Sequence, residues 1–304
     1  MTKQILRTEY LKLKGNSSFK VFTIFFIVFL PVIIFTIPSI IQDGMTGANT
    51  YPYLPRDYET TWYFTAYIAS WFSLFILSFI LIFHITNEYA YKTVRQNIID
   101  GYSRTDFFKS KLYMLLVIAI VATLYVAIVG FGAGLFFQTF EVSEGMGFNA
   151  LDLLNSGGAD MPNPMDLLDN YNNPKTEALD FGSPLVGITA VISYFVQVLA
   201  YLVFAVFVGF LFKKGAISVI IYFAAFVIEL ILGTQLDGQN MSWLADYLPL
   251  RTFSQVLPHP NFMDIITGLK SVENLNTTSV ILSLVYVVVF LVLTRIIFFK
   301  RDVA

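Results

Sequence analysis

The chain has 304 residues, of which 56% are hydrophobic and 13% charged, and its formal net charge is −2. Soluble domains carry roughly 25% charged residues, so this composition excludes an ordinary water-soluble domain and places most of the chain in lipid. The sequence contains no cysteine, which excludes disulfides, thiolate metal ligands and a cysteine nucleophile.

Residues 3–19 combine basic side chains with an apolar stripe. Leu6, Tyr10 and Leu13 recur at helical spacing, a pattern typical of a helix that lies on the inner leaflet of a membrane. We therefore expect an amphipathic elbow helix that leads into the first span. A disordered basic tail that only fixes the topology is the alternative.

Long apolar runs follow this segment. A helix needs about 20 residues to cross a hydrocarbon core about 30 Å thick. Runs of sufficient length occupy residues 21–42, 60–87, 112–140, 181–212, 215–236 and 274–299. They are continuously apolar, whereas the strands of a membrane barrel alternate over about ten residues. The sequence thus predicts an all-α integral membrane protein with six transmembrane helices, in a single domain over residues 1–304.

The basic residues set the expected orientation. With the amino terminus inside, 15 of the 19 Lys and Arg residues fall on the cytoplasmic side, and 15 of the 21 acidic residues fall outside. Short cytoplasmic segments retain Lys and Arg, so this asymmetry predicts that both termini are cytoplasmic. The outer loops would then be residues 43–59, 141–180 and 237–273.

The cytoplasmic loop 88–111 is polar and patterned. Asp100 and Gly101 predict a turn, and Ser103 with Asp106 three residues later forms a capping box that would start the third span's helix. Such a loop would project rigidly and expose basic side chains to a soluble partner. A simple positive-inside anchor explains the same charges equally well.

Two outer loops differ in character. Residues 141–180 are acidic and rich in turn formers, which predicts a solvated loop, and they lack the regular Asp/Asn spacing of a calcium loop. Residues 237–273 are too apolar for a free loop. Their proline-interrupted pieces predict short helices that re-enter the outer leaflet, with Trp243, Tyr247 and Pro249 as candidate outer-gate residues. We assign His259, between two prolines, to a turn.

Enzyme signatures are absent. The sequence has no HExxH, no GxSxG and no phosphate-binding GxxxxGK[ST] loop. We therefore expect no catalysis, no metal or other cofactor on this chain, and no nucleic-acid partner.

Glu229 is the one ionisable residue deep in a predicted span. A carboxylate in hydrocarbon is costly unless it is protonated, paired or hydrated. It could line a translocation path, or it could be a hydrogen-bonded structural group. An ion-coupled carrier usually has several such groups, so a single one favours an external energy source.

The loop after the second span resembles that of ABC-2 type (type V exporter) permeases. In that family an acidic residue is followed by a Gly-Thr pair, a Pro-x-Ser-Arg turn and a Gly-Lys before the third span. The matching residues here are Glu88, Thr93, Ser103, Arg104 and Lys111. Three positions depart from the pattern, with Lys92 for glycine, Gly101 for proline and Ser110 for glycine.

The resemblance implies a permease of the bacterial cytoplasmic membrane that pairs with a second copy or a paralogue. Each permease would dock on a separate ATPase subunit, which holds the ATP and magnesium. The coupling residues would be Glu88, Lys92, Thr93, Arg95, Gly101, Ser103, Arg104 and Lys111. Two other functions stay open: an ion-coupled secondary transporter that uses Glu229, and a non-transporting membrane scaffold or signalling subunit.

Overall fold

The computed structural model describes residues 9, 11–44, 58–99, 101, 103–145, 184–257 and 277–300. Within these ranges all regular secondary structure is helical. The elements are α2 (Ser17–Gly44), α3 (Tyr58–Phe72), η1 (Ser73–Leu77), α4 (Ser78–Ala90), α5 (Thr93–Ile99), α6 (Arg104–Gly145), α9 (Pro184–Phe212), α10 (Gly215–Gly238), α11 (Ser242–Ala245), α12 (Pro249–Ser254) and α14 (Thr277–Lys300). Residues 11–15 are also helical and precede α2.

In the described part of the chain, six helical segments are long and apolar enough to cross a bilayer. They are Ser17–Thr36, Thr61–Ala90, Arg104–Phe137, Gly187–Phe212, Gly215–Gly238 and Thr277–Lys300. The prediction of an all-helical chain with six spans is confirmed at this level, and the chain is a multi-pass membrane protein. The acidic loop 141–180, the loop 43–59 and His259 lie wholly or mostly outside the described residues.

The second span contains a π-helical turn that the sequence did not lead us to expect. The span consists of α3, the five-residue η1 and α4. The Ser78 hydroxyl donates to the Ser73 carbonyl, at 3.1 Å, across five residues. A π-turn inserts one residue into the helix and so shifts the register of everything that follows it.

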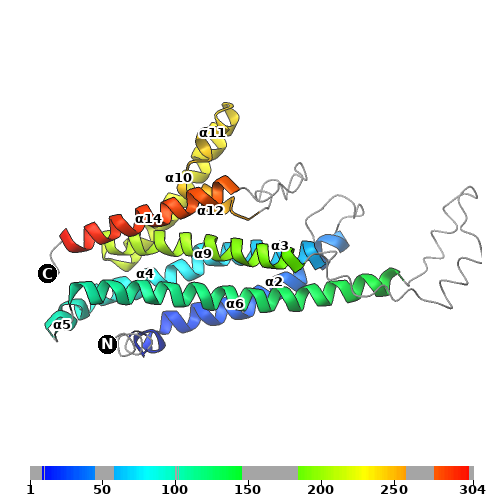
Figure 1. Cartoon of the computed structure of the whole chain (residues 1–304). Helices are drawn as coiled ribbons and strands as arrows, with labels where there is room; N and C mark the ends of the chain where they lie inside the picture. Colours follow the sequence, from blue (N-terminus) through cyan, green and yellow to red (C-terminus); the bar gives the residue numbers. More distant parts are fainter. Residues whose placement is uncertain are drawn as a thin grey trace, which may run out of the picture.

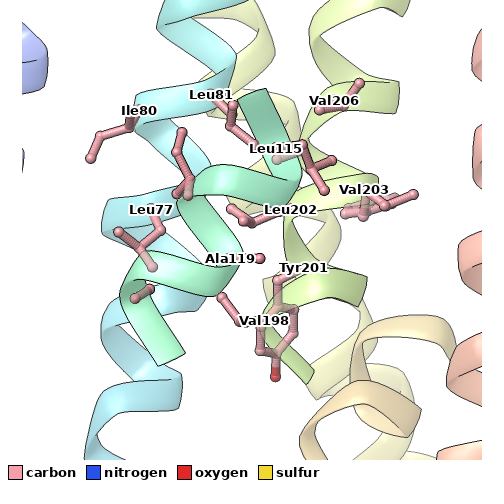
Figure 2. Close-up of a cluster of buried hydrophobic side chains, with 14 of the residues drawn as sticks. Leu77, Ile80, Leu81, Leu115, Ala119, Val198, Tyr201, Leu202, Val203 and Val206 are labelled. Atoms are coloured by element: carbon pink, nitrogen blue, oxygen red, sulfur yellow. The ribbon is translucent and has the colours of Figure 1, made fainter. Parts of the chain in front are cut away.

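The core lies between the second span, α6 and α9. Two thirds of the apolar window of α9 is buried inside the chain (67%), against 11% for α10. Leu115 and Ala119 of α6 lie between Leu77 and Leu81 of the second span and Leu202 of α9, as Figure 2 shows. The remaining apolar surface, on α2, α10 and α14 above all, is available to lipid or to another membrane chain.

The two ends of the bundle carry different elements. The short helix α5, the start of α2 and the end of α14 lie at one end, which we call the α5 end (Figure 1). The start of α14 and α12 lie toward the opposite end, the α12 end, and α10 with α11 leans away from the other helices (Figure 1). This arrangement agrees with alternate crossings by successive spans.

A buried charged cluster as the candidate functional site

Five ionisable side chains meet at the α5 end of the bundle. Glu9 and Lys12 come from the segment before α2, His84 and Glu88 from α4, and Lys111 from α6; we call them the charged cluster. Four are buried, with Lys111 only 1% exposed, and Lys12 is the member that reaches water. Buried charges are tolerated only when they are paired and hydrogen-bonded.

Lys111 occupies the centre of the cluster. Its Nζ lies 2.6 Å from Glu9 Oε2, 2.8 Å from Glu88 Oε2 and 3.3 Å from His84 Nε2. The contact with Glu88 is an ion pair whose angle does not meet hydrogen-bond geometry. A single ammonium therefore ties together two helices and the amino-terminal segment.

The other contacts close the cluster. His84 Nε2 lies 2.8 Å from Glu9 Oε2, and Lys12 Nζ lies 2.9 Å from Glu88 Oε1 and 3.5 Å from Glu9 Oε1. His84 Nε2 can donate to Glu9 or accept from Lys111, but not both at once. With His84 neutral, two carboxylates balance two ammonium groups.

The pairing shifts the pKa values of the two residues that precede the first span. Burial alone would raise the pKa of Glu9, but the His84 hydrogen bond and the Lys111 charge outweigh it and hold that pKa well below its usual value. Burial likewise opposes the charged form of Lys12, yet the charge and hydrogen bond of Glu88 raise the pKa of Lys12 above its usual value. Both groups are therefore charged at neutral pH.

Local helical spacing presents these side chains to one another. His84 and Glu88 are four residues apart, and Glu9 and Lys12 are three apart, so each pair shares a helix face. On α6, the Ser103 hydroxyl accepts from the Asp106 backbone N–H at 3.0 Å and donates to its carboxylate at 2.6 Å. This confirms the predicted cap, which fixes where α6 begins and hence where Lys111 falls.

The chemistry of the cluster is that of an internal ion network. Glu9, His84 and Glu88 offer three potential metal-ligand atoms within 4.8 Å of one another. The Lys111 ammonium already touches all three groups, so a divalent ion would have to displace it. The residues therefore suit a structural charge network and do not suit a metal centre.

Comparison with known proteins places the chain in a family. Residues 52–304 match the family described as "Protein of unknown function (DUF2705)". The chain belongs to the DUF2705 family. No match was found among curated proteins. The region shared with DUF2705 contains His84, Glu88 and Lys111, whereas Glu9 and Lys12 precede it. The DUF2705 match thus covers only part of the charged cluster.

The predicted coupling residues fall into two groups in this DUF2705 chain. Glu88 and Lys111 are buried in the charged cluster. Lys92, Thr93, Arg95, Gly101 and Ser103 lie in α5 and its flanking turns, and Arg104 is the first residue of α6. A direct partner contact by Glu88 or Lys111 stays a prediction, and their burial means that any effect on a partner would pass through the position of α5.

The backbone of the α5 turns explains two of these residues. Gly101 has φ +96°, and Lys92 has φ +55° although it is not glycine. Positive φ favours glycine because it has no Cβ. The Thr93 hydroxyl donates to the Glu88 carbonyl at 3.1 Å, which links the start of α5 to the end of α4.

At the α12 end, the Glu229 carboxylate is hydrogen-bonded to the backbone of α12. Its Oε2 accepts hydrogen bonds from the backbone N–H groups of Leu250, at 2.8 Å, and Arg251, at 3.2 Å. These are orphan donors in the first turn of α12, where Pro249 is the first residue. Glu229 thus caps a short helix, and these hydrogen bonds compensate for placing a carboxylate within a membrane span.

Glu229, Gly233 and Asp237 lie on one face of α10, and all three contact Arg251. Asp237 receives two hydrogen bonds from the Arg251 guanidinium, at 2.7 and 3.1 Å. Gly233, between them, provides the space for that side chain. Residues 229, 233 and 237 are spaced by four and share one helix face. Of the other candidates, Trp243 is 63% exposed and Tyr247 51% exposed, and the Tyr247 carbonyl accepts from Tyr286.

Sequence reasoning missed Glu9, Lys12 and His84 as site residues. The sequence signal for these residues is their spacing. His84 and Glu88 are four residues apart at the end of a span, and Glu9 and Lys12 are three residues apart, so each pair presents its charges on one helix face and the two faces can form ion pairs. That the facing surface would be the amino-terminal segment could not be derived without the packing.

Proposed function

We propose that this chain is the transmembrane permease subunit of an ATP-driven exporter, which pairs with a second permease and couples to a separate ATPase subunit through α5. The supporting observation is the buried Glu88–Lys111 pair, at 2.8 Å. It joins the two ends of the segment that carries the family resemblance and so makes α5 a fixed projection between α4 and α6. A fixed projection can transmit motion, whereas a loose loop absorbs it.

The free charges around α5 support a partner there. Lys92, Arg95 and Arg104 make no salt bridge in the described part of the chain, and Lys92 and Arg95 are exposed. Basic groups at a projecting tip that have no acidic partner among the described residues suit the steering and registration of a protein partner.

The conformation of Lys92 also supports the resemblance. ABC-2 permeases have glycine at the matching position, and the positive φ of Lys92 is the backbone geometry for which glycine is favoured. Lys92 thus retains the backbone conformation expected of glycine at this position and adds a basic side chain.

The charged cluster suggests how such coupling would work. Because Glu9 and Lys12 bind the same Lys111 and Glu88 that fix α5, a displacement of α5 would move the amino-terminal elbow together with α4 and α6. In this proposal the α5 end faces the cytoplasm of a bacterium, both termini are cytoplasmic, and α11 and α12 are re-entrant helices that gate the outer side.

The alternatives gain less from the geometry. The Glu229 carboxylate is engaged by two backbone amides of α12, so it serves as a helix cap and gives an ion-coupled carrier no specific support. A scaffold or signalling subunit would use the same α5 surface without moving a solute.

An affinity purification tests the proposal. The full chain, tagged and extracted in mild detergent, is compared with Arg95→Glu/Arg104→Glu and with a control, Lys14→Glu/Lys300→Glu, which reverses two exposed charges at the same end. We expect a P-loop ATPase with the wild type and the control, and its loss with the α5 variant. If no ATPase accompanies any of the three, the permease proposal is wrong.

A further inference from the structure

Two large apolar side chains stand exposed at the tip of the α5 end. Tyr91, just after α4, is 76% exposed, and Ile99, at the end of α5, is 74% exposed. They are the two most exposed large apolar residues in the described part of the chain. Exposed apolar groups on a membrane protein are expected to face lipid, so their position relative to the bilayer decides their meaning.

The lipid-facing surface of α6 ends before this tip. From Tyr113 to Phe136 the exposed large residues of α6 are apolar, and include Leu116, Val117, Ile120, Val121, Leu124 and Ile128. Between Arg104 and Leu112 the exposed residues are Thr105 and Lys109, both polar. Tyr113 is nine positions after Arg104, so the start of α6 lies about 14 Å beyond the last exposed apolar side chain of α6, and about 6 Å beyond Phe108, which contacts the exposed Phe299 of α14. The tip therefore projects clear of the hydrocarbon.

Packing holds the α5 tip in a defined position. Val94 is buried and Ile98 packs against the core, while Arg95 and Ile99 share the adjacent, exposed face of α5. The Thr93 hydroxyl and the capped start of α6 fix both ends of the segment. A rigid apolar side chain loses little entropy when a partner covers it, which is the property of a binding anchor.

The charge around the two residues indicates the chemistry of the partner. Lys92 and Arg95 are exposed beside them, whereas the acid of the segment that lies in the described residues, Asp106, is hydrogen-bonded to Ser103. We propose that Tyr91 and Ile99 are the apolar anchors of a docking surface for a soluble protein whose groove has an apolar floor and an acidic margin. The inference rests on the proposed function, under which that protein is the ATPase subunit.

A soluble partner fits this surface better than the bilayer does. An anionic membrane surface would attract the basic residues, but the geometry of α6 keeps Ile99 away from the acyl chains. An apolar anchor ringed by polar and charged groups is the usual anatomy of a protein interface.

The first test compares matched pairs of truncations. Tyr91→Ala/Ile99→Ala is set against Tyr113→Ala/Ile120→Ala, which removes the same two residue types from the lipid-facing side of α6. We expect the ATPase recovered per permease to fall at least about tenfold with the first pair and to stay at the wild-type level with the second. Undiminished recovery with the first pair would overturn the anchors and leave the permease proposal standing.

A second test does not depend on the identity of the partner. The chain lacks cysteine, so Ile99→Cys provides a single site for a membrane-impermeant maleimide on inside-out vesicles. We expect slow labelling in native vesicles and fast labelling after peripheral proteins are stripped with urea, with Lys14→Cys labelled at the same rate in both. Equal rates for residue 99 before and after stripping would overturn the inference, whether labelling is fast, as for an uncovered surface, or slow, as for burial by lipid or a second copy.

The two tests separate the failures. If the wild type recovers no ATPase but residue 99 is uncovered by stripping, the permease proposal fails and the soluble-partner surface stands. If an ATPase is recovered and residue 99 labels equally throughout, the surface fails and the permease proposal stands.

Discussion

Gly233 of α10 lies directly against the guanidinium of Arg251, so that a Cβ built at residue 233 would stand 2.7 Å from Nη1. A non-bonded carbon and nitrogen do not come that close, so a Cβ at residue 233 would force the guanidinium to move. Arg251 is also held by two hydrogen bonds to Asp237 and an ion pair to Asp246. The absence of a side chain at 233 therefore leaves room for Arg251 to lie along α10.

Gly233→Ala should loosen the attachment of α12 to α10. The new methyl displaces the guanidinium, the far end of a flexible side chain, from the partly exposed Asp237, at an expected cost of up to about 1 kcal/mol. The measurement is thermal unfolding in detergent, together with limited proteolysis between α10 and α12. The control is Gly238→Ala on the same helix, where nothing lies within 4 Å of the added carbon, and it should change stability by less than about 0.5 kcal/mol. Equal effects of the two substitutions would contradict the assigned contact.

Lys111→Met should be among the most damaging substitutions at the α5 end. It leaves the Glu9 and Glu88 carboxylates buried without their shared cation, and breaking a buried ion pair costs about 3–5 kcal/mol. The measurement is thermal stability in detergent and the yield of folded protein. Lys109→Met is the matched control, because Lys109 lies two residues away on the same helix and is exposed. A control as unstable as the Lys111 variant would show that the cluster is not the cause.

Acid should weaken the attachment of the amino-terminal segment. Glu9 has a folded-state pKa below its unfolded value, which is near 4.5, so its contribution is complete above that value and declines as the pH falls through the lower, folded-state pKa. We expect the wild type to lose more stability than Glu9→Gln when the pH is lowered from about 6 to about 3. The measurement is the unfolding temperature across that range, and parallel curves would contradict the pairing of Glu9.

The buried Ser73–Tyr194 pair predicts an asymmetry between its two partners. The two hydroxyls lie 2.6 Å apart, and the Ser73 hydroxyl also donates to the Ala69 carbonyl at 2.9 Å. Tyr194→Phe leaves Ser73 bonded and should cost little. Ser73→Ala leaves the fully buried Tyr194 hydroxyl without its partner and should cost about 1–3 kcal/mol.

A double-mutant cycle checks this asymmetry. The variant with both substitutions should be more stable than Ser73→Ala alone, because it removes the unpaired hydroxyl. Thermal unfolding of the four proteins in one detergent provides the comparison. A double variant at least as unstable as Ser73→Ala would contradict the prediction.

The spans and helix starts could be predicted because their causes are local. Apolar runs of sufficient length, the Ser103 cap and the Gly101 turn each depend on a few neighbouring residues, and each agrees with the structure. The sequence also predicts that Glu229 has a hydrogen-bonding or charged partner, because a carboxylate within a span must be compensated. Its partners, two backbone amides 21 and 22 residues away, are not encoded locally.

The charged cluster and the π-turn could not be predicted for a common physical reason. Each depends on how helices distant in sequence fit together. Lys111 looked like one of many cytoplasmic basic residues, and only the packing of α4 and α6 against the amino-terminal segment buries it. The register shift at η1 leaves no pattern in an apolar run, because every residue in it is compatible with either turn.

The π-turn also determines the direction in which the charged end of the second span faces. One residue of an α-helix corresponds to a rotation of about 100° about its axis. If Ser73–Leu77 became regular α-helix with every residue kept, His84 and Glu88 would turn by about that angle, away from Lys111, whereas deletion of one residue together with the π-turn would leave their direction unchanged. The π-turn in the middle of the second span thus sets the angular alignment of His84 and Glu88, which lie seven and eleven positions beyond Leu77, and through them the alignment of the end that carries α5.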